Sequence, residues 1–113
     1  MDYLYLIWEG GQDAETADRA DVMRDMLAWT AGLVAQGNLR GGAPLQAGGQ
    51  ARSVKRRGGA ASVIDGPYAE TKEVIGGFCL VDAASMEEAV AIAEGCPAAR
   101  YGAVEIREIL PLQ

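Results

Sequence analysis

The sequence predicts a mixed α+β fold in which two helices pack on one antiparallel sheet. Three observations support this prediction: an aromatic and β-branched run at residues 3–8, apolar residues at helical spacing between about residues 13 and 37, and a second apolar run at residues 78–81 that precedes a capped helix. A chain of 113 residues and 11.9 kDa has the length of one compact domain. We therefore expect a single domain over residues 1–113.

The first two elements are a strand and a long helix. Residues 3–8 are apolar at every position, so both faces of this strand need cover. The helix begins near Asp13 and ends at Gly37, which is placed to adopt the left-handed conformation of a C-cap. Its apolar stripe consists of Ala20, Met23, Leu27, Thr30 and Val34, flanked on one side by Val22, Met26, Trp29 and Leu33.

The middle of the chain predicts an irregular strand and a hairpin. Residues 38–50 are rich in glycine and favour only a short, irregular strand. Gly58 and Gly59 form a two-residue turn between the arms 51–57 and 60–65. The first arm carries four of the ten Lys and Arg residues: Arg52, Lys55, Arg56 and Arg57. Such a cluster either protects an exposed strand edge from aggregation or anchors an anionic ligand or acidic partner.

The last third completes a βαββαβ order. Residues 78–81 form a strand, Ser85 and Glu88 form a capping box at the start of a helix, and residues 103–110 form a strand that alternates apolar and charged positions. This order, with the hairpin inserted, is the ferredoxin-like plan. Two helices cover one face of such a sheet, so either Leu4, Leu6 and Trp8 or Tyr3, Tyr5 and Ile7 remain bare. We expect a second copy to cover that face, giving a homodimer with a dimeric α/β-barrel.

Composition narrows the classes of partner. Sixteen Asp and Glu against ten Lys and Arg give a net charge of −6, which disfavours nucleic acid and anionic membrane surfaces as partners. The longest apolar run is too short to span a bilayer, and no basic signal-peptide region opens the chain, so we expect a cytoplasmic protein. Histidine is absent, Cys79 and Cys96 form no CxxC pair, and no glycine-rich nucleotide fingerprint occurs. We therefore expect no metal, no cofactor and two cysteines buried as small apolar residues.

Three segments carry a family resemblance. Residues 65–73 read DGPYAETKE and are followed by Gly76, Gly77 and Phe78, the chain opens with YLYLI at residues 3–7, and residues 96–107 read CPAARYGAVEIR. On these residues the chain resembles the YCII-related family, and within it the DGPF-domain subgroup. The resemblance implies a dimeric α+β barrel with a cleft in each protomer, similar in fold to cofactor-free enzymes such as muconolactone isomerases. It also implies genes that often neighbour those of extracytoplasmic-function sigma factors.

Five side chains are candidates for a polar cleft at this motif. Asp65 either acts as a base, if desolvation raises its pKa, or fixes the turn before Gly-Pro by accepting backbone N–H bonds. Glu70 and Lys72 share one face of an extended segment and form either an ion pair or a joint ligand contact, with Lys72 an electrophilic anchor. Tyr68 either stacks on a planar ligand or fills the core. Arg107 either anchors a carboxylate inside the barrel or is an ordinary edge charge.

Two functions follow from these candidates. One is a cofactor-independent enzyme of isomerase or lyase type that acts on a small anionic metabolite. The other is a non-catalytic ligand-binding or regulatory module, linked by the resemblance to an extracytoplasmic-function sigma factor system. Relatives in the DGPF subgroup often carry His where Cys96 and Tyr101 stand, so imidazole-based proton transfer cannot be carried over to this chain.

Overall fold

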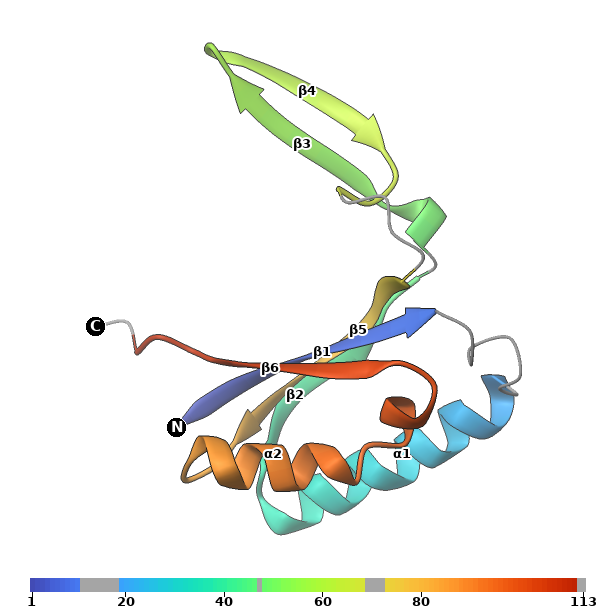
Figure 1. Cartoon of the computed structure of the whole chain (residues 1–113), viewed down its shortest axis with the longest axis vertical. Helices are drawn as coiled ribbons and strands as arrows, with labels where there is room; N and C mark the ends of the chain where they lie inside the picture. Colours follow the sequence, from blue (N-terminus) through green and yellow to red (C-terminus); the bar gives the residue numbers. More distant parts are fainter. Residues whose placement is uncertain (11–18, 47, 69–72, 112–113) are drawn as a thin grey trace.

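The computed structural model describes residues 1–10, 19–46, 48–68 and 73–111 (Figure 1). In chain order the elements are β1 (Asp2–Gly10), α1 (Arg19–Gln36), β2 (Leu39–Pro44), the 3₁₀ turn η2 (Gly48–Gln50), β3 (Arg52–Arg57), β4 (Ala60–Asp65), β5 (Glu73–Asp82), α2 (Met86–Glu94), the 3₁₀ turn η3 (Pro97–Arg100) and β6 (Ala103–Glu108). Among these residues no helix is long and apolar enough to cross a membrane.

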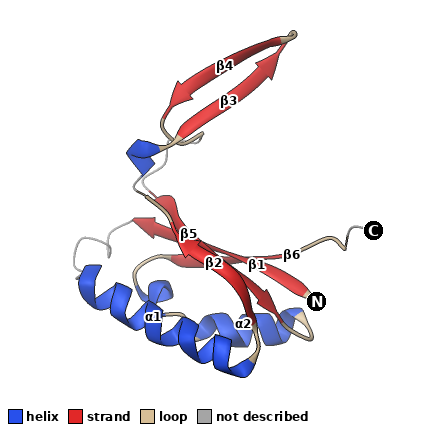
Figure 2. Cartoon of the chain, turned by 180° about the vertical axis from the view of Figure 1, so that it is seen from behind, coloured by secondary structure: helices blue, strands red, loops and turns tan. Residues whose placement is uncertain are grey.

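Four strands form one antiparallel sheet in the order β2-β5-β1-β6. Both helices lie on the same side of this sheet, as Figures 1 and 2 show from opposite directions. The two strands predicted to be apolar on both faces, β1 and β5, occupy the centre, and the alternating strand β6 lies at an edge. The ferredoxin-like fold is thereby confirmed.

The helices cover the face of β1 that carries Tyr3, Tyr5 and Ile7. These side chains are buried, together with Cys79 and Val81 on the neighbouring strand β5. The opposite face, which we call the bare face, carries Leu4, Leu6 and Trp8. The register places Leu80 beside Leu4 and Phe78 beside Leu6, so this face continues onto β5 as an apolar surface. The structure thus decides which of the two residue sets on β1 the helices cover, and neither described helix lies on the bare face.

Tyr5 ties both helices to the central strand. Its side chain is fully buried, and its hydroxyl donates to the Ala89 carbonyl of α2 at 2.5 Å. Its ring stacks near Trp29 of α1, with ring centroids 6.5 Å apart. Burial raises the pKa of Tyr5 to about 12, so the phenol keeps its proton and remains a donor at neutral pH.

The sequence correctly predicts the cap at the end of α1 and the cap at the start of α2. Gly37 adopts a φ of 81°, and the next amide, that of Asn38, donates to the Leu33 carbonyl at 2.9 Å, which completes a C-terminal cap. At the start of α2, the Ser85 hydroxyl accepts from the Glu88 amide at 3.2 Å, while the Glu88 carboxylate accepts from the amide of Ala84. The capping box is therefore present.

The face of α1 that packs on the core is the flank of the predicted stripe. Met26 and Trp29 pack against the core cluster and Leu33 is buried, while Met23, Leu27 and Val34 are exposed. Two overlapping stripes on one helix have similar apolar content, so spacing alone does not choose between them. Tertiary packing decides, because Trp29 stacks near Tyr5, and Met26 lies 3.6 Å, sulfur to sulfur, from Cys96.

The predicted hairpin forms a separate two-stranded sheet of β3 and β4. Gly58 and Gly59 have φ values of 59° and 78°, the pattern of a tight two-residue turn. The hairpin extends away from the four-stranded sheet on the side opposite the helices (Figures 1 and 2). It contributes to a radius of gyration of 15.7 Å, compared with about 13 Å for a compact domain of this length.

The hydrogen bond from Tyr5 to α2 can be tested by removing one hydroxyl. Tyr5→Phe is expected to lower the free energy of unfolding by about 1 kcal/mol, since a buried hydrogen bond is lost without a cavity. Tyr3→Phe is the matched control, because the Tyr3 ring is equally buried while its hydroxyl donates to no residue in the described part of the chain. Urea denaturation of both variants measures the difference, and equal losses would contradict the role given to the Tyr5 hydroxyl.

Candidate functional site

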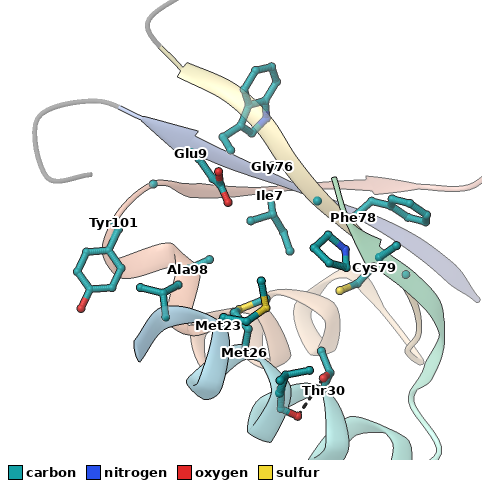
Figure 3. Close-up of a pocket in the computed structure, with 18 of the residues that line it drawn as sticks. Ile7, Glu9, Met23, Met26, Thr30, Gly76, Phe78, Cys79, Ala98 and Tyr101 are labelled. Atoms are coloured by element: carbon teal, nitrogen blue, oxygen red, sulfur yellow. Dashed lines mark hydrogen bonds between the residues drawn. The ribbon is translucent and has the colours of Figure 1, made fainter. Parts of the chain in front are cut away.

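A pocket of about 480 Å³ lies between α1 and the helix-covered face of the sheet. We call it the helix-side pocket (Figure 3). Its floor comes from β1, β2 and β5, its wall from α1, and its far end from the segment that includes Ala98 and Tyr101. The lining is mainly apolar. Pockets that bind small molecules commonly measure roughly 300–1,000 Å³ and have apolar walls with a few polar groups.

Glycines leave the floor of this pocket without side chains. Gly77 pairs with Ile7 and Gly42 pairs with Cys79, so both glycines stand on the helix-covered face beside buried residues. A Cβ on Gly42 would lie 2.5 Å from the Phe78 carbonyl oxygen, and its φ of 151° is one that other residues rarely adopt. Close approach of β2 to β5 therefore requires glycine, and the same residue leaves room beneath α1.

The α1 wall is built from flexible apolar side chains. Met23, Met26 and Leu27 line the pocket, and the Thr30 hydroxyl donates to the Leu27 carbonyl at 3.1 Å within the helix. The Thr30 hydroxyl therefore has its donor occupied and can offer a ligand only an acceptor. Methionine side chains adapt to ligands of different outline, because their chains are unbranched and polarizable.

Glu9 brings a carboxylate to the pocket. A register shift in the pairing of β1 with β5 falls between Ile7 and Trp8, and Gly76 is the extra residue on β5. A Cβ on Gly76 would lie 2.1 Å from Glu9 Cδ, so the Glu9 side chain occupies the space that this glycine leaves. Figure 3 shows the carboxylate directed toward the interior of the pocket, between Ile7 and Tyr101. Among the lining residues that the structure describes, Glu9 alone carries a charge.

Glu9 was missed in the sequence analysis, although the sequence contains a signal for it. On a strand, alternate residues face the same side, and Glu9 follows Tyr3, Tyr5 and Ile7 in that series. A carboxylate that continues a buried apolar series marks the point where the core opens to a polar space. That signal depends on knowing which face of the strand the helices cover.

Cys79 adds a thiol to the pocket wall. It is free and buried, as is Cys96, which confirms the expected role of both cysteines as small core residues. Burial raises the pKa of the Cys79 thiol from its usual value near 9 to about 11, and the neighbouring Cys96 thiol contributes to the shift. Because the thiolate is the reactive form, Cys79 is a weak nucleophile at neutral pH.

The predicted site residues at the hairpin lie outside this pocket. Asp65 ends β4 with a side chain that is 87% exposed, and its carboxylate pairs with Arg52 at 3.0 Å. Tyr68 is 72% exposed, and Lys55 Nζ lies 4.9 Å from its ring centroid. Neither residue lines the helix-side pocket, so their predicted roles in a cleft stay predictions.

Arg107 lies on the bare face of the sheet. The register pairs it with Leu4, and its guanidinium lies 3.7 Å from the Glu105 carboxylate, which also accepts from Trp8 Nε1 at 3.1 Å. Its side chain is 70% exposed on the edge strand β6, and its role as a ligand anchor stays a prediction. The remaining two candidates, Glu70 and Lys72, lie outside the described residues.

The chain is similar in sequence to proteins of one known family. The YCII-related domain matches residues 1–113. This chain belongs to the YCII-related family. An uncharacterized protein of Rhizobium meliloti is 38% identical over 90 residues, which cover 78% of this chain and 73% of that protein.

A solved structure shares the YCII-like fold. It is 5-chloro-2-hydroxyhydroquinone dehydrochlorinase from Burkholderia phenoliruptrix AC1100, in complex with 2,5-dihydroxybenzoquinone. The superposition has a TM-score of 0.55 with 18% identity and covers 97% of this chain and 94% of that one. At this identity the similarity establishes the fold, and the residues of the helix-side pocket are considered on their own geometry.

The state of the Cys79 thiol has a consequence for stability at high pH. Its folded pKa near 11 exceeds its unfolded value near 9, so the folded state keeps the proton longer, and the stabilisation present below pH 9 is lost as pH rises toward 11. We expect the unfolding free energy of the wild-type chain, relative to that of Cys79→Ala, to fall by about 1–2 kcal/mol across this interval. Urea titrations of both proteins from pH 8 to 11.5 measure it, and a constant difference would contradict a desolvated thiol.

Proposed function

We propose that this YCII-related protein binds a small, ring-sized, largely apolar molecule in the helix-side pocket and that Glu9 accepts a hydrogen bond or a proton from it. The observation that carries the proposal is a single carboxylate directed into an apolar pocket of about 480 Å³. Apolar walls contribute most of the affinity, and one polar group orients the ligand. The proposal thus assigns affinity to the walls and orientation to Glu9.

The chemistry available at Glu9 is acid–base chemistry. A carboxylate within hydrogen-bonding reach of a hydroxyl group, or of a carbon beside a carbonyl, removes a proton and returns it at another position. An isomerase-type or lyase-type reaction needs one such group at minimum. Glu9 is exposed in the free protein, and a ligand that fills the apolar pocket would displace water beside the carboxylate and strengthen this interaction.

The charge of the pocket favours one class of ligand over another. From the sequence we expect a small anionic metabolite, but the described lining presents a carboxylate and no Lys or Arg. An anionic group next to Glu9 would be repelled, whereas a neutral hydroxyl would be attracted as a donor. We therefore propose a neutral ligand with a hydroxyl group on a ring. The quinone bound to the structurally similar dehydrochlorinase supports a ring as the first choice of probe.

The proposal includes a homodimer that packs bare face to bare face. Leu4, Leu6 and Leu80 are only partly buried on this face, and Phe78 is 37% exposed. An apolar surface of this kind is stabilised when a second sheet covers it. The ion pair of Arg107 with Glu105 lies beside it on β6 and suits the wetter rim of such an interface.

The second candidate function is ligand binding without turnover. The chain has no histidine, and the pocket thiol Cys79 is protonated at neutral pH, so Glu9 is the only charged side chain in the described lining. In this case the same pocket senses a small molecule, and a regulatory role, such as the association with a sigma factor system that the family resemblance implies, depends on ligand occupancy. Both candidates place the ligand at the same residues.

Ligand binding is tested with hydroquinone as the probe and benzene as its apolar counterpart. We expect hydroquinone to shift the amide NMR signals of Ile7, Gly76 and Gly77, and Glu9→Gln to weaken its binding about tenfold, since a charge-assisted hydrogen bond becomes a neutral one. The same substitution should change the affinity for benzene less than twofold. Glu94→Gln, an exposed residue of α2 outside the pocket, is the control with the same change in charge.

Three results would contradict the proposal. One is the absence of signal shifts at the pocket amides with either probe at millimolar concentration. Another is equal weakening of hydroquinone binding by Glu9→Gln and Glu94→Gln, which would assign the effect to overall charge. The third is equal weakening of hydroquinone and benzene by Glu9→Gln, which would show that the substitution alters the shape of the pocket.

A further inference from the structure

The hairpin of β3 and β4, residues 52–65, has apolar side chains that are exposed among the residues the structure describes. We call this hairpin the arm. Val54 and Val63 face each other across the two strands, and they are 65% and 66% exposed. Ile64, on the other side of the arm, is 46% exposed. An isolated two-stranded hairpin is marginally stable in water, so further packing would stabilise the arm.

The arm and the rest of the chain have opposite net charge. The arm contains four Lys and Arg residues and one Asp, whereas six Lys and Arg against fifteen Asp and Glu remain outside it. Arg52 pairs with Asp65, but Lys55, Arg56 and Arg57 form no ion pair with any residue that the structure describes. Within the described residues no carboxylate neutralises these three cations, and Lys55 lies over the Tyr68 ring, so they can attract an acidic surface such as the rest of this chain.

The position of the arm selects which acidic surface it reaches. Both views of the fold show the helices on one side of the four-stranded sheet and the arm extending on the other (Figures 1 and 2). This other side is the bare face. A second copy packed on the bare face would therefore lie next to the arm, and two-fold symmetry would place its own arm next to the first copy.

We propose that the arm of each protomer clasps the second copy of this chain, with Lys55, Arg56 and Arg57 against carboxylates of that copy. The inference rests on the homodimer in the proposed function and adds the contact that the arm makes. Charge complementarity favours a second copy, since its net charge outside the arm is strongly negative. The exposed Val54 and Val63 provide apolar area for the same contact.

Zero-length carbodiimide cross-linking tests the contact directly, because it joins an amine to a carboxylate in contact with it. The chain has two lysines, Lys55 and Lys72, so few amines compete. Equal amounts of unlabelled and ¹⁵N-labelled protein are mixed, cross-linked and analysed by mass spectrometry. We expect mixed-isotope peptides that join Lys55 to an Asp or Glu of the other copy. Lys55→Arg keeps the charge and should remove these peptides while leaving the dimer intact.

A charge reversal tests the energetic contribution of the arm. Arg56→Glu is expected to raise the dimer dissociation constant about fivefold or more, since each dimer holds two copies of the altered contact. Arg24→Glu is the matched control, because this exposed arginine belongs to α1 on the helix-covered side. The dimer dissociation constant of Arg24→Glu should stay within twofold of the wild-type value. Raising the salt concentration should weaken the wild-type dimer more than the Arg56→Glu dimer.

The possible results distinguish the contact made by the arm from the homodimer itself. If the protein is dimeric but Lys55 links only to its own copy, or if Arg56→Glu and Arg24→Glu have equal effects, the arm contact is overturned and the homodimer stands. If the protein is monomeric, the homodimer and the arm contact both fail, while hydroquinone binding at Glu9 can still be measured. If Lys55 cross-links only to a different protein added from lysate, the arm serves another partner and this inference is wrong.

Discussion

Two helices can cover only one face of a four-stranded sheet, and the remaining architecture depends on this constraint. The central strand β1 is apolar on both faces, with Tyr3, Tyr5 and Ile7 beneath the helices and Leu4 and Leu6 on the other side. The covered face supplies the core. The bare face is an apolar surface in a chain with a net charge of −6, and neither described helix covers it, so its proposed cover is a second copy.

The covered face also explains where the pocket lies. The core is tight where Tyr5 joins α2 and Trp29, and it opens where glycines replace side chains on β2 and β5. The same close approach of strands that requires Gly42 leaves a space under α1, and the bulge at Gly76 makes room for the Glu9 side chain. Two glycines therefore shape the pocket, Gly42 at its floor and Gly76 beside its charged group. The pocket and the proposed dimer interface lie on opposite faces of the sheet.

The sequence predicts the fold well because its signals are local. The capping box at Ser85, the left-handed Gly37 and the Gly58-Gly59 turn each report on a few neighbouring residues, and all three are present. The site is harder to predict, because the pocket depends on contacts between distant segments. Which stripe of α1 packs inward is decided by Tyr5 and Cys96, and the charged residue of the pocket is recognised only once the covered face of β1 is known. A conspicuous motif such as DGPYAETKE attracts attention without revealing where the cavity lies.

The proposed interface between two copies at the bare face can be tested by sedimentation velocity. The wild-type protein is compared with the Leu6→Glu variant. Leu6 lies on that face and contacts no helix-side residue of the core cluster, so a charge there should disrupt association without unfolding the protomer. We expect a wild-type dimer at micromolar concentration and a Leu6→Glu monomer with the same helical circular dichroism. A wild-type monomer across the accessible concentration range, with the same sedimentation coefficient as the variant, would contradict it.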